Sequence, residues 1–144
     1  MCLLGFCGLG ERLDAFQHDL GGDAKKLAML GGGDVLFGVF ASRIWEIKNK
    51  NLIDDVVMTT KELITNVIKH SQANEIAVDV SLVENKIVII VQDNGIGFNF
   101  EKNEGQGMKS IKNRAIMHEG IVDIDSNKKG TSVTVELKIK NDKI

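Results

Sequence analysis

The segment EIAVDVSLVENKIVIIVQDNGIGF, residues 75–98, gives the clearest evidence for the fold of this chain. Apolar and polar residues alternate over 75–83, which predicts a strand with one buried face. A tight turn at Glu84 and Asn85 leads into the apolar run 86–92, which predicts a buried central strand. Because strands joined by so short a turn pair antiparallel, the stretch predicts the hairpin around which a sheet is built.

Two helices and a second hairpin flank this stretch. Apolar residues at helical spacing predict a helix over about 54–72, and a second helix is predicted over 108–119. Alternating residues at 121–126 and 131–139 predict two further antiparallel strands joined by a glycine turn. The expected core-facing residues are Val56, Val57, Leu63, Ile64, Val67 and Ile68 in the first helix, and Met108, Ile111, Ala115 and His118 in the second. Since the apolar face of the sheet must be covered, we predict an α+β fold, a two-layer sandwich of helices on a mixed, mainly antiparallel sheet.

Composition and charge are those of a soluble globular protein of about one domain. The 144 residues are 43% hydrophobic and 26% charged, as in folded globular chains. Lys and Arg number 18 against 20 Asp and Glu, so no broad positive field exists, which argues against nucleic acid as a partner. The apolar runs are much shorter than the ~20 residues that span a bilayer, so we expect no membrane segment. The two cysteines support neither a disulfide framework nor a zinc site, which favours a reducing, cytoplasmic location.

The helical stretch KELITNVIKHSQA carries a polar arc opposite its apolar stripe. At about 100° per residue, Glu62, Asn66, Lys69 and His70 all fall within this arc. The oxygens of Glu62 and Asn66 suit Mg²⁺, a hard cation, and the two basic side chains can balance phosphate charge. The solvated face of an ordinary amphipathic helix would carry similar residues, so this pattern alone does not decide between the two interpretations.

The motif DNGIGF, residues 93–98, places a carboxylate beside bare backbone at the end of a strand. Asp93 can accept a hydrogen bond from an exocyclic amine, while Gly95 and Gly97 let a flat base approach the chain. An Asx turn is the alternative interpretation, since Asp-Asn-Gly is also turn chemistry.

Two later motifs complete the candidate site. In EGQGMKSIKNRA, Gly105 and Gly107 precede a helix whose free N–H groups can meet an anion, with a flexible surface loop as the alternative. At the turn that opens the last strand, Thr131 offers a hydroxyl that can bond Asp93 directly or through water. A simple turn residue is an equally good interpretation of Thr131.

The succession of ExxxN with KHSQA, then DNGIG, then GQGMKSIKNRA, then GT resembles the ATP-binding domain of the GHKL superfamily, the Bergerat ATP fold. Within that superfamily, the sequence is most similar to sensor histidine kinases of the nitrate-sensor and desaturase-thermosensor type. The resemblance covers roughly residues 52–140. It implies an ATP-binding catalytic domain at 51–144, preceded by an N-terminal segment, 1–50, that is a shortened dimerisation or phosphoacceptor region.

The resemblance also implies a role for each motif residue. Asn66 would chelate Mg²⁺, and Glu62 would be a catalytic residue that helps to organise the metal and the phosphoryl transfer. Asp93 would select adenine with the support of Thr131. The other nucleotide-binding residues would be Lys69 and His70 near the phosphates, Gly95 and Gly97 around the base, Gly105 and Gly107 as hinges of a lid, and Met108. ATP and Mg²⁺ are therefore the expected cofactors.

His18, followed by Asp19 in ERLDAFQHDLGG, is the candidate phosphoacceptor. Its imidazole can attack the γ-phosphorus while the neighbouring carboxylate takes the proton. Kinases of this kind carry that histidine in a long two-helix hairpin, and here the glycine triplet at 31–33 interrupts the segment where continuous helix is required. We therefore favour a surface histidine in a shortened segment and keep the phosphoacceptor as the alternative.

The leading hypothesis is the catalytic domain of a two-component sensor histidine kinase, which passes the γ-phosphate of Mg-ATP to a histidine for relay to a response regulator. The resemblance also implies a homodimer. Two alternatives stay open: an anti-sigma-factor-type serine kinase with the same ATP fold, and a non-catalytic nucleotide-binding or dimerisation module. The segment GMKSIKNRAIMHEG is more similar to the histidine kinases than to the serine kinases.

Overall fold

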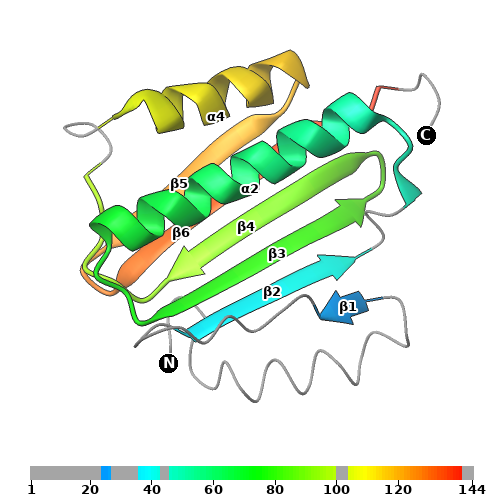
Figure 1. Cartoon of the computed structure of the whole chain (residues 1–144). Helices are drawn as coiled ribbons and strands as arrows, with labels where there is room; N and C mark the ends of the chain where they lie inside the picture. Colours follow the sequence, from blue (N-terminus) through cyan, green and yellow to red (C-terminus); the bar gives the residue numbers. More distant parts are fainter. Residues whose placement is uncertain (1–23, 27–35, 43–45, 100–103, 141–144) are drawn as a thin grey trace.

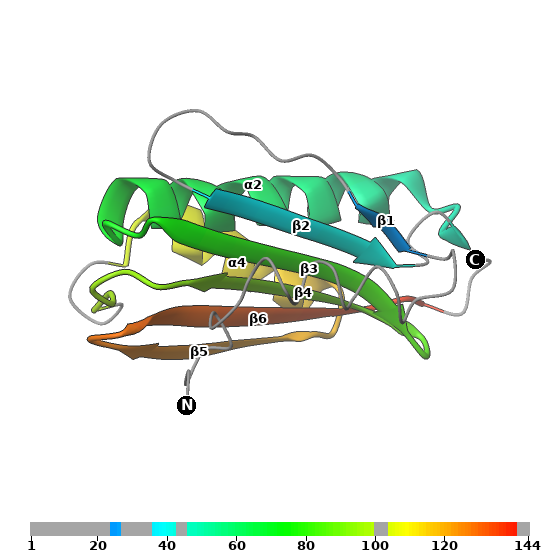
Figure 2. The same cartoon turned by 90° about the horizontal axis from the view of Figure 1, so that it is seen from below.

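A computed structural model of the chain describes residues 24–26, 36–42, 46–99 and 104–140. The elements in chain order are β1 (Ala24–Lys26), β2 (Leu36–Ser42), α2 (Lys50–His70), β3 (Glu75–Val83), β4 (Lys86–Asp93), α4 (Gln106–Met117), β5 (Ile121–Asn127) and β6 (Gly130–Lys138). The strands form one sheet in the order β1-β2-β3-β4-β6-β5, and α2 and α4 lie together on one of its faces (Figure 1). Figure 2 shows the same arrangement from below the view of Figure 1, with α2 beside the sheet. The predicted α+β sandwich is confirmed.

The sheet is mixed and mainly antiparallel, as predicted. β3 and β4 form the expected hairpin, with Val83 opposite Lys86 at its turn. β4 also pairs antiparallel with β6, and β6 with β5, so β4 lies in the interior of the sheet. Among the described strands only β2 and β3 pair parallel, and α2 is the crossover between them. β1 and β2 precede residue 50, and both belong to the same sheet as the later strands. The division into an N-terminal segment, 1–50, and an ATP-binding domain, 51–144, stays a prediction.

The hydrophobic core lies between the helices and one face of the sheet. Along β4, Ile87, Ile89 and Val91 face the helices and are at most 1% exposed. Val88 and Ile90 point to the opposite face and are only half-buried, because none of the described helices covers that face. Burial of one such aliphatic side chain contributes about 1.5–3 kcal/mol. The prediction of a buried central strand therefore holds for its helix-facing side.

Helix α2 has a cap at each end. The side chain of Asn49 accepts a hydrogen bond from the backbone N–H three residues on, and the hydroxyl of Ser71 donates to the carbonyl of Val67 at 2.8 Å. The buried stripe consists of Leu52, Val56, Thr59, Leu63 and Val67. Val57 and Ile68 were expected in this stripe, but they are 43% and 63% exposed. Each directly follows a stripe residue and is turned about 100° away from it, which directs it to solvent.

Helix α4 presents three of the four predicted residues to the core. Met108, Ile111 and Ala115 are buried, at 3%, 0% and 2% exposure. His118 caps the C-terminal end and contacts Asp55 of α2 rather than the core. Within the described part of the chain, neither helix is long and apolar enough to cross a membrane.

Candidate functional site

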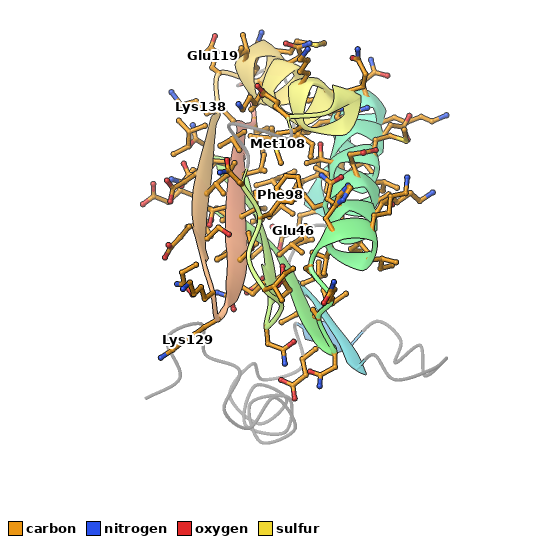
Figure 3. The ribbon with its side chains drawn as sticks, turned by 90° about the vertical axis from the view of Figure 1, so that its left-hand side faces the viewer. Glu46, Phe98, Met108, Glu119, Lys129 and Lys138 are labelled. Atoms are coloured by element: carbon orange, nitrogen blue, oxygen red, sulfur yellow. The ribbon has the colours of Figure 1, made fainter. Side chains whose placement is uncertain are left out.

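A narrow pocket opens between the helices and the sheet, at the end of the molecule where α2 and β4 finish. Its empty volume, counted to the open solvent at the mouth, is ≈ 360 Å³. Its walls are Leu63, Asn66, Val67, His70, Ser71, Val91, Asp93, Phe98, Met108, Thr131 and Val133. Figure 3 places Phe98 and Met108 in the space between the sheet and the helices. Five predicted site residues, Asn66, His70, Asp93, Met108 and Thr131, thus meet in one pocket.

Asp93 supplies the buried charge of this pocket. It is the last residue of β4, it is 1% exposed, and its carboxylate accepts a hydrogen bond from the N–H of Gly95 at 2.8 Å. Burial raises the pKa of Asp93, and hydrogen bonds from the N–H groups of Gly95 and Thr131 lower it without cancelling the effect of burial. A carboxylate has about four acceptor positions, so two N–H donors leave capacity for a donor placed in the pocket.

The loop after Asp93 needs glycine for two different reasons. The N–H of Ile96 donates to the carbonyl of Ser71 at 2.8 Å, and a Cβ on Gly95 would overlap that same carbonyl oxygen. Gly97 has φ +85°, a left-handed conformation that side-chain-bearing residues rarely adopt. The loop therefore packs closely against the end of α2, where the other wall of the pocket begins.

The Asn94 side chain links the same loop to the start of β3 through hydrogen bonds. Its side-chain oxygen accepts hydrogen bonds from the N–H groups of Asn74 and Glu75, both at 3.0 Å. Its amide nitrogen donates to the side chain of Asn74 at 2.5 Å. Asn94 was not among the predicted site residues, because an Asp-Asn-Gly sequence does not reveal which distant backbone groups its side chain will bind.

Helix α2 forms one wall through Asn66 and His70. The predicted polar arc does not lie opposite the buried stripe; these two residues follow Leu63 and Val67 by three positions each and border the stripe. The His70 ring packs against the Phe98 ring with centroids 5.0 Å apart and planes tilted by 36°. Lys69 is exposed and does not line the pocket.

The N-terminus of α4 approaches Glu62. Gly105 is the N-cap of α4 and no side chain caps the helix, so N–H groups of its first turn remain available to an anion. The Cα of Gly107 faces the Glu62 carboxylate so closely that a Cβ would overlap it. The Glu62 side chain is flexible and can move aside, so this contact alone does not require glycine at 107, and a Cβ at Gly105 would meet nothing within 4 Å.

Thr131 contacts Asp93 through its backbone, and the predicted bond from its hydroxyl through water stays a prediction. The two residues are directly opposite in the β4–β6 ladder, and the backbone N–H of Thr131 donates to the Asp93 carboxylate. The Thr131 hydroxyl instead lies 2.9 Å from the Ser126 hydroxyl, which also accepts a hydrogen bond from the Phe98 N–H at 2.8 Å. Neither Ser126 nor Phe98 was a predicted site residue. Ser126 ends a predicted strand and Phe98 ends the DNGIGF motif, and neither position by itself indicates a role in the pocket.

Glu62 and Asn66 offer hard oxygen ligands one helical turn apart. Neither side chain has a hydrogen-bond partner within the described residues. No group of three His, Cys, Asp or Glu side chains in the described ranges can enclose a metal ion. This donor set fits Mg²⁺, which usually keeps waters and substrate phosphates among its ligands, better than a metal that needs a cage of protein ligands. His18, the candidate phosphoacceptor, lies outside the described residues.

The protein is an α+β domain with a pocket between the helices and the sheet that they cover. Residues 51–141 match the family described as histidine kinase-, DNA gyrase B- and HSP90-like ATPase, and the chain belongs to this family. Among its relatives, the oxygen sensor histidine kinase NreB of Staphylococcus carnosus is 36% identical over 94 residues, 62% of this chain and 27% of NreB. The sensor histidine kinase DesK of Bacillus subtilis is 31% identical over 116 residues, 76% of this chain and 30% of DesK. The predicted resemblance to sensor histidine kinases is confirmed.

The chain spans less than a third of the curated relatives it matches, 11%, 22% and 30% of three of them. A solved structure of the Erythrobacter litoralis EL346 blue-light activated histidine kinase is similar over 93% of this chain and 41% of its own, with a TM-score of 0.67 and 17% identity. At that identity, the likeness shows the shared fold.

Proposed function

We propose that this chain is the Mg-ATP-binding catalytic part of a sensor histidine kinase, and that it passes the γ-phosphate of ATP to a histidine for relay to a response regulator. The observation that carries the proposal is the buried Asp93 carboxylate, which faces a pocket whose opposite wall carries Asn66 and His70. A buried carboxylate without a cationic partner lowers the stability of the folded state. Such a group is therefore typical of a site where it accepts a hydrogen bond from a ligand.

Asp93 would accept a hydrogen bond from the exocyclic amine of adenine. Gly95 and Gly97 keep the loop beside it free of side chains, which allows a flat base to approach the backbone. His70 and Phe98 add two ring systems to the same pocket. Such rings favour a planar base, because aromatic faces stack at centroid separations of about 4.5–7 Å.

The phosphates would extend toward Glu62 and the N-terminus of α4. Mg²⁺, when bound, supplies charge neutralisation on the phosphoryl group. Asn66 and Glu62 would hold that ion, the uncapped N–H groups after Gly105 would bind phosphate oxygens, and exposed Lys69 would approach the triphosphate from the mouth. Catalysis would then rest on positioning and electrostatic stabilisation, with Glu62 orienting the groups at the γ-phosphate.

The histidine that accepts the phosphate belongs to this chain at His18 or to a partner. A response regulator as the downstream acceptor, assembly as a homodimer and a cytoplasmic location all follow from the likeness to sensor histidine kinases and belong to the same proposal.

Ligand-dependent stabilisation tests the binding half of the proposal. Mg-ATP and ADP should raise the Tm of the wild type with ligand concentration, by an equivalent of about 2.7 kcal/mol at a hundredfold excess over Kd. Asp93→Asn should remove most of that shift, because an amide nitrogen can then face the adenine amine. A wild type whose Tm stays unchanged with both nucleotides would overturn the proposal.

Labelling with γ-³²P-ATP tests the transfer half. Acid-labile label on His18, or on a histidine of an added partner, supports the histidine kinase. Acid-stable label on a serine of a partner would replace it with the serine kinase, and binding without any label would leave a nucleotide-binding module.

A further inference from the structure

Four residues form one row across the sheet, all on the face that the helices cover. Ile76 lies opposite Asp93, Asp93 opposite Thr131, and Thr131 opposite Ser126. The last three are polar, and they follow one another from an interior strand to the edge strand β5. Two of them, Asp93 and Thr131, line the pocket at 1% and 4% exposure.

The hydrogen bonds along this row constrain where the hydroxyl protons point. The Ser126 oxygen accepts from the Phe98 N–H at 2.8 Å and lies 2.9 Å from the Thr131 oxygen. Each hydroxyl has one proton and two acceptor positions. If Ser126 donates to Thr131, its proton is used and the Thr131 proton is left to point into the pocket. If Thr131 donates instead, it offers only an acceptor to the pocket, and the proton of half-buried Ser126 is left without an acceptor among the described residues. Either arrangement leaves one proton for a partner outside the row, and only the first directs that proton into the pocket.

We propose that Ser126 is a positioning residue that turns the Thr131 hydroxyl into a hydrogen-bond donor in the pocket, so that Thr131 and Asp93 together distinguish adenine from guanine. This inference rests on the proposed function. Ser126 touches no part of the nucleotide itself; it acts by accepting from Phe98 and donating to Thr131.

The distinction follows from the order of donors and acceptors on a purine. Adenine presents an amine donor beside the ring nitrogen N1, an acceptor, whereas guanine presents a carbonyl acceptor beside an N–H donor. An ionised Asp93 next to a donating Thr131 matches adenine at both positions, directly or through one water. Guanine would set a carbonyl against the carboxylate and leave buried groups unpaired, which disfavours binding.

Ser126 also anchors Phe98, and the two roles predict different results. A displaced Phe98 ring would weaken stacking on any purine, so the affinities for ATP and GTP would fall by the same factor. A Thr131 hydroxyl that is free to rotate can donate or accept, so it would weaken ATP and improve GTP. A change in the ratio of the ATP affinity to the GTP affinity therefore reports the direction of the Thr131 proton. A fall of both affinities by the same factor reports a displaced Phe98 ring.

Calorimetric titration of the whole chain with Mg-ATP and with Mg-GTP measures both. We expect Ser126→Ala to lower the preference for ATP over GTP by about two- to tenfold, and Ser126→Thr, which keeps the hydroxyl, to restore it. Ser132→Ala is the matched control, since Ser132 follows Thr131 on the opposite face and pairs with Gln92. It should leave the preference unchanged.

Thr131→Val provides a second route should Ser126→Ala fail to fold. It removes the donor itself, so it should lower the preference at least as much, and adding Ser126→Ala should lower it no further. An unchanged preference in Ser126→Ala or in Thr131→Val would overturn the inference while the wild type still binds Mg-ATP. A wild type that binds neither nucleotide would overturn the proposed function and this inference with it.

Discussion

His118 lies at the C-terminal end of α4 with its Nε2 atom 2.7 Å from the Oδ2 atom of Asp55, which belongs to the first half of α2. The Arg114 Nε atom is 3.7 Å from the other Asp55 oxygen. The backbone carbonyl of His118 also accepts a hydrogen bond from Lys138, so this end of α4 is attached to both α2 and β6. The opposite end of α4 carries Met108 into the pocket.

Breaking this contact should loosen α4 and weaken nucleotide binding at a distance. A double-mutant cycle with Asp55→Ala and His118→Ala should give a coupling free energy of about 0.5–1 kcal/mol in urea unfolding, because both side chains are partly exposed to screening solvent. The control is the ion pair Lys86–Glu136, at 2.8 Å, which joins β4 to β6 and does not line the pocket. Its removal should lower stability without changing the Kd for Mg-ATP. Additive effects of the two α2–α4 substitutions would contradict this account.

Gly95→Ala should damage both stability and binding. The added Cβ would overlap the Ser71 carbonyl oxygen, a backbone atom that cannot swing aside, so the loop must move away from α2. We expect a loss of about 1–3 kcal/mol in unfolding free energy and a more than tenfold higher Kd for Mg-ATP. Gly105→Ala is the control, since its Cβ would meet nothing within 4 Å, and it should cost less than about 1 kcal/mol. Equal effects of the two substitutions would rule out the steric explanation.

Thr59→Val should stabilise the protein. Thr59 is 0% exposed in the core-facing stripe of α2, and its hydroxyl has no hydrogen-bond partner among the residues that the structure describes. Valine has nearly the same shape without the unpaired polar atom, so we expect a gain of about 1 kcal/mol in urea unfolding with an unchanged m-value. The neighbouring Thr60 hydroxyl donates to Val56 at 2.7 Å, and Thr60→Val should bring no such gain. A destabilised Thr59→Val would show that the hydroxyl does find a partner in solution.

Glu119→Gly should also stabilise the protein, through the backbone. Glu119 follows the end of α4 with φ +51°, a left-handed conformation that costs a side-chain-bearing residue about 1–2 kcal/mol. Glycine removes this cost but loses more entropy on folding, which leaves a net gain of about 0.5–1 kcal/mol. Asn113→Gly, in the exposed interior of α4, should instead lower the Tm. Thermal unfolding of the two variants and the wild type measures both changes in Tm, and a lower Tm for Glu119→Gly would contradict the prediction.

The raised pKa of Asp93 should give opposite pH dependences to folding and to binding. As pH falls through this pKa, the native state takes up a proton that the unfolded state does not yet bind, so the Asp93 contribution to stability increases. Over the same range the protonated carboxyl is a weaker acceptor, so Mg-ATP affinity should decrease. The carboxyl ¹³C shift of Asp93 measures the pKa directly, and bound Mg-ATP should lower it. A carboxyl that titrates at or below the ordinary aspartate range would contradict the burial argument.

The fold could be predicted because its signals are local. Alternation over residues 75–83 and 131–139 specifies strands with one buried side whatever their partners, and glycine-marked turns fix which strands pair. The failure at Val57 and Ile68 shows the limit. A run of apolar residues on a helix does not state which 100° arc will meet the sheet, and only the packing of α2 on β4 selects it.

The site was predictable to the extent that its residues belong to compact motifs. Asn66, His70, Asp93, Met108 and Thr131 each lie in a recognisable motif, and all five line the pocket. Ser126 and Asn94 were not predicted because their roles depend on register and on loop closure. Whether a serine on β5 meets a threonine on β6 depends on which residues stand opposite in the ladder.

The α+β sandwich and its family could be derived from the amino-acid sequence alone, and the residues proposed to bind a nucleotide and its metal stay predictions. Periodicity and motif order are encoded in neighbouring residues, so they are readable without coordinates. Only the tertiary structure decided which of those groups face one another: the hydroxyl of Thr131 toward Ser126, the ring of His70 toward Phe98, and the carboxylate of Glu62 toward Gly107. These contacts join positions far apart in the chain, and their geometry is fixed only when strand register and helix packing are complete.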